Sequence, residues 1–154
     1  MKNSSPPDPE MIGQIFGLFN EIGIINQLSR TLFEARLEPG MTLPHFSVLN
    51  HLMRLGDGWT PLRLARAFQV PKTTMSHTLA GLVRKGYVRL EPSPDDGRAK
   101  CVFLTDEGRA CRDAAISAIA PDIAELAPRL PEGLIAEALP HLTALREILD
   151  KARD

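Results

Sequence analysis

The sequence predicts a mainly α-helical chain of the α+β class, in which short helices and a β-hairpin are flanked by long helices. Apolar residues recur every three or four positions over most of the chain, which is the period of an amphipathic helix. Within residues 87–104 the period changes to two on either side of a Pro-, Asp- and Gly-rich stretch, which predicts two strands and a turn. Aromatic residues make up only 5% of the chain while Ala and Leu are plentiful, and this composition favours helices.

The N-terminal part is predicted to be a tail followed by a long helix. Residues 1–9 contain three prolines and are expected to form a loose tail. Gly40 is expected to close the connection after the helix. The apolar positions that define the helix are Ile12, Ile15, Phe16, Phe19, Ile22, Ile25, Leu28 and Leu32.

Three shorter helices are predicted in the middle of the chain, over residues 44–55, 61–68 and 73–85. Proline suits the first turn of the helices over residues 44–55 and 61–68, and Thr60 is expected to cap the helix over residues 61–68. Gly86 stands where a left-handed residue would end the third.

A β-hairpin and two further helices are predicted to complete the chain. Residues 87–91 and 100–104 are expected to form the strands, and Thr105 to cap a long Ala-rich helix. Pro121 is expected to bend that helix, and Pro131 to start a last one. Pro140 lies inside the last helical pattern and weakens the case for its continuity.

The order helix, short helix, tight turn, helix and hairpin defines a winged helix-turn-helix. Its two central helices can pack through Leu64, Ala65 and Phe68 on one, and Met75, Leu79 and Leu82 on the other. We therefore expect a winged helix-turn-helix lobe over residues 41–104. The long helices of residues 10–40 and 105–154 would form a dimerisation region, because one small domain does not readily bury three apolar stripes.

Charge is distributed unevenly along the chain. The net charge is only -1, but residues 61–100 hold eight basic and three acidic side chains, a local balance of +5. Binding to phosphate needs a local basic surface rather than a basic chain. The distribution is therefore compatible with double-stranded DNA as a partner.

Polar and basic side chains gather where such a lobe would meet DNA. The second helix of the motif enters the major groove, and an arginine in the wing suits the narrow minor groove. A solvated polar face explains the helix alone equally well, but the adjacent hairpin favours DNA contact, with Asp96 expected to orient Arg98 by a forked hydrogen bond. The residues assigned to DNA contact are Lys72, Thr73, Thr74, Ser76, His77, Thr78, Arg84, Lys85, Asp96, Arg98 and Lys100.

Residues 62–105 resemble the DNA-binding core of the MarR family of bacterial regulators. The resemblance rests on an ordered set of segments: the Leu64-Ala65 pair, PKTTMSHTL at 71–79, LVRKGYV at 82–88 and DDGRAK at 95–100. The flanking long helices match in number and place. One departure is Gln69, which stands where glycine is common in the turn.

The resemblance implies a homodimer held by the terminal helices, a palindromic operator and, in many members, relief of repression by a small ligand. By position, Thr73, Thr74, Ser76 and His77 would read bases and Arg98 would enter the minor groove. We expect an effector pocket between the dimerisation helices and the DNA-binding lobes. Phe19, His51 and Trp59 are candidates to line it, although core packing accounts better for each.

Other classes of function find little support. His45 and His51 are six residues apart on one helix, which does not suit a metal, so no metal or cofactor is expected. There is no phosphate loop or nucleophile motif, so no enzyme is predicted. The chain lacks a signal peptide pattern and a membrane-spanning apolar run, which makes the cytoplasm the expected location.

Two alternatives stay open at this point. The first is a redox-responsive regulator working through Cys101 or Cys111, of which Cys111 has arginines near it in sequence. The second is a winged-helix module that binds protein and not DNA. The basic middle segment argues against the second, because protein-binding surfaces tend to carry apolar anchors.

Overall fold

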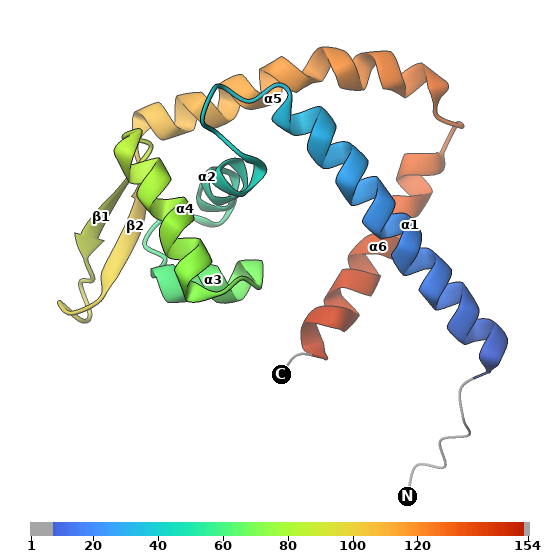
Figure 1. The fold of residues 1–154 in the computed structure, drawn as a ribbon, viewed down its shortest axis with the longest axis horizontal. Helices are drawn as coiled ribbons and strands as arrows, with labels where there is room; N and C mark the ends of the chain where they lie inside the picture. Colours follow the sequence, from blue (N-terminus) through green and yellow to red (C-terminus); the bar gives the residue numbers. More distant parts are fainter. Residues whose placement is uncertain (1–7, 153–154) are drawn as a thin grey trace, which may run out of the picture. The chain divides into compact units, whose positions relative to one another are not determined.

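The computed structural model describes residues 8–152, which form two compact units that divide between Ile119 and Ala120 (Figure 1). Residues 1–7 of the expected tail lie outside the described residues. In the described part of the chain, no helix combines the length and apolar character that a membrane crossing requires. The elements are α1 (Pro9–Glu34), α2 (Leu43–Leu55), α3 (Pro61–Phe68), α4 (Lys72–Arg84), β1 (Val88–Pro92), β2 (Lys100–Leu104), α5 (Asp106–Leu126), the 3-10 turn η1 (Ala127–Arg129) and α6 (Leu134–Lys151).

The core of the first unit is built by α2, α3, α4 and the hairpin. Leu49, Leu64, Leu82 and Val102 are fully buried, one from each of α2, α3, α4 and β2. The predicted packing of α3 on α4 is confirmed, since all of its residues belong to the buried cluster or pack against it. The complete buried cluster is Met41, Val48, Leu49, Leu52, Leu64, Ala65, Met75, Leu79, Leu82, Val88, Val102 and Leu104.

The helix ends follow the expected local signals. The Thr60 side chain accepts a hydrogen bond from the Arg63 amide, as an N-cap does (3.2 Å). Gly86 has φ +74° and ends α4 in the left-handed conformation, with the Tyr87 amide bonded to the Leu82 carbonyl. That bond ties Tyr87 to the helix end, so β1 begins one residue later than predicted.

The hairpin pairs its strands in an antiparallel register with Val88 opposite Leu104 and Pro92 opposite Lys100. A short segment before α3 adds to its edge: the Trp59 carbonyl accepts from the Val102 amide at 2.9 Å. The wing is therefore attached at its base to the start of α3.

The long helices differ from prediction at their ends. Asp8 caps α1 and Pro9 opens it, so these two residues begin the helix. The Thr105 cap is confirmed, because its hydroxyl accepts from the Gly108 amide at 3.0 Å. The predicted start of the last helix at Pro131 is wrong: α6 begins at Leu134, after Gly133 with φ +79°. Helix α6 continues through Pro140.

Candidate nucleic-acid interface

Helix α4 buries one face and exposes the other. Met75, Leu79 and Leu82 are at most 3% exposed and anchor the helix in the core. The side chains exposed on the other face are Lys72, Thr73, Thr74, Ser76 and His77. No side chain caps the N-terminus of α4, so its first backbone N–H groups are available to a ligand. Such N–H groups and the helix dipole favour an anion such as phosphate.

Thr78 is placed differently from the prediction. It is only 7% exposed, and its hydroxyl donates to the Thr74 carbonyl one turn earlier at 3.1 Å. The side chain is therefore turned into the lobe and satisfied by the helix backbone, and it does not belong to the exposed face.

The end of α4 separates two predicted phosphate contacts. Arg84 is exposed. The Lys85 ammonium instead donates to the Pro39 carbonyl at 3.1 Å and lies 3.4 Å from Glu38 Oε1. Tyr87 donates to the same Glu38 oxygen at 2.6 Å, and this bond raises the pKa of the tyrosine. Lys85 thus holds the connection between α1 and α2 against the end of α4.

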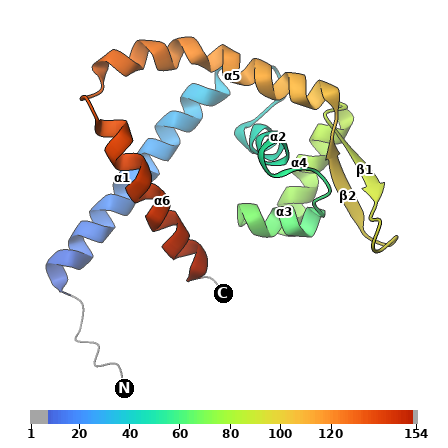
Figure 2. The ribbon, with the colours of Figure 1, turned by 180° about the vertical axis from the view of Figure 1, so that it is seen from behind.

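The hairpin loop exposes Arg98, with Asp96 beside it and Lys100 at the start of β2. Asp96 Oδ1 accepts from the Arg98 backbone amide at 3.0 Å. The expected fork between this carboxylate and the guanidinium is therefore wrong: Asp96 shapes the turn and leaves the guanidinium exposed. In both ribbon views the hairpin loop lies at the same end of the lobe as α3 and the N-terminal end of α4 (Figures 1 and 2).

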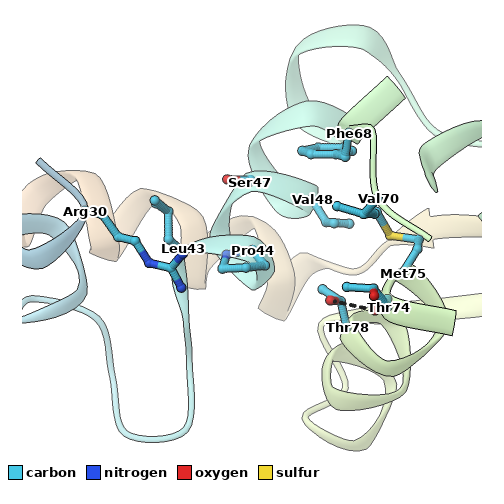
Figure 3. Close-up of a pocket in the computed structure, with 10 residues that line it drawn as sticks. All are labelled: Arg30, Leu43, Pro44, Ser47, Val48, Phe68, Val70, Thr74, Met75 and Thr78. Carbon is cyan, nitrogen blue, oxygen red and sulfur yellow. Dashed lines mark hydrogen bonds between the residues drawn. The ribbon is translucent and has the colours of Figure 1, made fainter. Parts of the chain in front are cut away.

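A pocket of about 190 Å³ lies between α4, α2 and Arg30 of α1 (Figure 3). Its lining is largely apolar, and Arg30 of α1 supplies its cation. Thr74 therefore lies between two surfaces, since it is exposed on α4 and also borders the pocket. The lining residues are Arg30, Leu43, Pro44, Ser47, Val48, Phe68, Val70, Thr74, Met75 and Thr78. The sequence predicts an effector pocket between the long helices and the lobe but none of these lining residues, because no spacing rule connects Arg30 to α4.

The three residues suggested for an effector pocket do not come together in it. The His51 and Trp59 rings pack edge to face with centroids 4.4 Å apart, and the centroid of Phe68 lies 5.2 Å from that of His51. Phe19 is 43% exposed on α1. His51 and Trp59 thus pack against each other. Phe68, their neighbour, lines the pocket.

His45 and His51 have environments that favour the neutral ring. His45 Nδ1 accepts from the Thr42 amide at 3.1 Å at the start of α2. Burial, followed by the charge of Lys85, lowers the pKa of His45. His51 Nε2 is buried without a hydrogen-bond partner, and burial likewise lowers the pKa of His51. Residues 8–152 bring together no group of three or more His, Cys, Asp or Glu side chains that would hold a metal ion.

Comparison with known proteins agrees with this architecture. Residues 40–99 match the model described as the MarR family. Wild-type MarR from E. coli in its apo form is 28% identical, with a TM-score of 0.72 over 83% of this chain and 96% of that one. The transcriptional regulator BldR from Sulfolobus solfataricus is 22% identical, with a TM-score of 0.77 over 88% of this chain and 96% of that one, and shows the shared fold.

A third structure was solved with nucleic acid. A cysteine-to-serine mutant of E. coli MarR complexed with operator DNA is 27% identical, with a TM-score of 0.72 over 90% of this chain and 99% of that one. The fold and its exposed helix and wing define a winged helix-turn-helix protein. Over residues 40–99 the chain matches the MarR family of transcriptional regulators.

Proposed function

We propose that the protein is a sequence-specific regulator that binds double-stranded DNA through α4 and the wing. The observation that carries the proposal is the joint exposure of the α4 polar face and Arg98 at one end of the lobe (Figures 1 and 2). A helix in the major groove with an arginine in the adjacent minor groove reads both base edges and groove width. The operator complex of the related MarR mutant supports the same mode of binding here.

The side chains proposed to contact DNA are fewer than those first predicted. Thr78 is buried and Lys85 is engaged with Glu38 and Pro39, so we leave both out. Asp96 acts through the turn. Those retained are Lys72, Thr73, Thr74, Ser76, His77, Arg84, Arg98 and Lys100. We assign the DNA-binding lobe to residues 41–104, and we place the regulator with the chromosome in the cytoplasm.

The functional form is a homodimer on a palindromic operator. Helices α1 and α6 contain no buried residue within the single chain. Phe16 is 74% exposed and Leu28 67% exposed on α1, and Ile148 is 65% exposed on α6. Apolar surface on this scale marks an interaction site, and a twofold pair would present two recognition helices one DNA turn apart. Residues 10–40 and 105–154 would then supply the dimer contacts.

A small effector would act through the pocket between α4, α2 and Arg30, and we propose that it relieves repression. The lining suits an apolar molecule of modest size with an anionic group near Arg30. Occupancy at Thr74 and Met75 would bias the position of α4, which is how a ligand shifts a protein between two states. Benzoate is a suitable probe: it should weaken operator binding by the wild type, and Ser47→Phe, which fills the pocket, should abolish that response.

The redox alternative gains little from the cysteine environments. Cys101 is 4% exposed in the wing. Burial and the charge of Glu38 raise the pKa of the Cys111 thiol, which disfavours the reactive thiolate. Operator affinity should therefore be unchanged by mild oxidant.

The decisive variant pairs Thr74→Ala with His77→Ala. Both side chains are exposed on α4, so the change should remove preference for the operator over random duplex by roughly 1–3 kcal/mol per lost base contact. Fluorescence anisotropy with labelled duplex measures both affinities. The control pairs Thr143→Ala with His141→Ala, the same residue types exposed on α6. Retained preference in the α4 variant would argue against the proposal.

A further inference from the structure

The outer side of α3 carries two arginines that have no carboxylate partner within residues 8–152. Leu64 and Ala65 turn the other side of this helix into the core, at 0% and 3% exposure. Arg63 and Arg66 are exposed and lie one turn apart. Like charges at this spacing repel on a helix. Across residues 8–152 no acidic side chain forms an ion pair with either arginine, so the repulsion is left uncompensated within the chain.

Arg63 is held in a defined position by Trp59. Its guanidinium carbon lies 3.9 Å from the centroid of the indole ring, in a cation–π arrangement. The Trp59 backbone is in turn fixed by its bond to Val102 in β2. Stacking engages the face of the guanidinium and leaves its N–H edge free to bind an oxyanion. Arg63 therefore presents hydrogen-bond donors at the junction of α3 with the wing.

A third cation strengthens the local positive potential. Arg54 at the end of α2 is exposed and likewise has no carboxylate partner in the described residues. Arg54 and Arg63 both lie near His51. Burial lowers the pKa of His51, and the charges of these two arginines lower it further. Clustered unpaired arginines favour an anionic partner, since an anion would remove their mutual repulsion.

Helix α3, which carries Arg63 and Arg66, lies at the end of the lobe that carries the DNA-contact residues. Helix α3, the N-terminal end of α4 and the hairpin loop occupy the same end in both ribbon views (Figures 1 and 2). A duplex in contact with α4 and Arg98 would bring backbone phosphates alongside α3 as well. Charge complementarity then selects those phosphates as the partner.

We propose that Arg63 and Arg66 bind backbone phosphates of the duplex and so fix the register of α4 in the major groove. The proposal rests on the proposed function and adds to it a contact made by α3. Phosphate contacts position a protein on DNA without reading sequence, whereas base contacts specify. Arg63 and Arg66 are therefore positioning residues, and their loss should affect all duplexes alike.

The test measures anisotropy of labelled operator duplex and of random duplex at several salt concentrations. Each lost phosphate contact reduces the slope of log affinity against log salt by about 0.9, so the Arg63→Ala, Arg66→Ala variant should lose about 1.8 per protomer, or about 3.6 for a bound dimer. The loss should be equal on both duplexes, which leaves the preference for operator unchanged. Arg63→Lys, which retains the charge, should keep the slope. Arg129→Ala, an exposed arginine paired with Glu125, is the control and should match the wild type.

The outcomes distinguish failure of the proposed DNA binding from failure of the proposed α3 contact. A wild type that binds neither duplex overturns the proposed function and the α3 contact together. A wild type that binds, with an unchanged slope in the double variant, overturns the α3 contact alone. A lower melting temperature with an unchanged slope would show that the arginines are structural, and this also overturns it.

Discussion

Gln69 ends α3 in a backbone conformation that glycine adopts more easily. Among residues 8–152 it is the only non-glycine with positive φ, at +54°. The Gln69 amide bonds to the Arg66 carbonyl and the Val70 amide to the Ala65 carbonyl, so the left-handed residue makes the tight turn between α3 and α4. Gln69 therefore adopts the left-handed conformation at a position where glycine is common.

Replacing Gln69 by glycine should stabilise the protein. A left-handed residue with a Cβ costs about 1–2 kcal/mol, and the extra freedom of glycine in the unfolded chain offsets roughly half of that. We expect Gln69→Gly to raise the free energy of unfolding by about 0.5–1 kcal/mol in urea titrations. Gln69→Ala keeps the Cβ and should give no such gain. Equal stability of the two variants would contradict this explanation.

His51 should make the lobe sensitive to acid. Burial, then the charges of Arg54 and Arg63, lowers its pKa in the folded state below the ordinary value of 6.5. The neutral ring is thus favoured by folding, so this contribution to stability is present above pH 6.5 and is lost as the pH falls toward the lowered pKa. The loss is at most about 1.4 kcal/mol per pH unit for one proton.

Chemical denaturation at a series of pH values measures this dependence. In His51→Phe the dependence on pH below about 6.5 should be shallower than in the wild type. His141→Phe, a substitution at an exposed site on α6, should leave it unchanged. Identical pH profiles for the wild type and His51→Phe would show that His51 does not titrate in this way.

Single-residue placement was the least predictable level from sequence. Thr78 follows Met75 by three positions and lies at the border between the buried and exposed faces of α4, where helical period alone does not decide. The sequence predicts a phosphate contact for Lys85, because nothing in it links Lys85 to Glu38, which is 47 positions away. Contacts between distant segments are fixed by packing and leave no local pattern.

At the scale of elements, the start of α5 is tied to the end of α4 by one hydroxyl group. Thr105 Oγ1 donates to the Gly86 carbonyl at 2.7 Å and accepts from the Gly108 amide. Gly108 is required beside it, because a Cβ there would overlap the Tyr87 carbonyl oxygen. The wing and α5 are thereby joined to the helix proposed to enter the major groove.

Removing the hydroxyl should therefore destabilise the protein. We expect Thr105→Ala to lower the free energy of unfolding by about 1–2 kcal/mol, the usual cost of an N-cap together with a lost hydrogen bond. Thr105→Ser keeps both bonds and should remain close to the wild type. Urea titration compares the three proteins, and a Thr105→Ala variant as stable as Thr105→Ser would refute the role of the hydroxyl.

Elements with strong local signals were predicted to within one residue. The predicted bounds of α3 agree with the observed ones. Thr60-Pro61 marks the start of the helix, and the turn after Phe68 marks its end. Two prolines of the second unit made the bounds and the continuity of α6 harder to predict. Pro131 precedes the observed start of α6, and Pro140 lies inside a helix that continues. A proline restricts the chain locally but does not reveal which neighbouring residue begins the helix.

At the scale of the whole molecule, the exposed apolar side chains of α1 predict association. The double substitution Phe16→Glu, Leu28→Glu on α1 should convert the proposed dimer to a monomer, because burying unpaired charges in the interface costs several kcal/mol. Sedimentation velocity at micromolar concentration measures the mass. Gln14→Glu with Gln27→Glu adds the same charges at polar positions of α1 and should remain dimeric. A wild type that sediments as a monomer would remove the basis for a palindromic operator.

The central claim, that two copies bind one specific duplex, is tested most directly by anisotropy titrations of the wild-type protein. The labelled duplex comes from upstream of the protein's own gene, and the comparison is a scrambled duplex of equal length and composition. We predict tighter binding to the upstream duplex, an affinity that falls steeply with salt, and saturation at two chains per duplex. Equal affinity for the two duplexes at every salt concentration would contradict the claim.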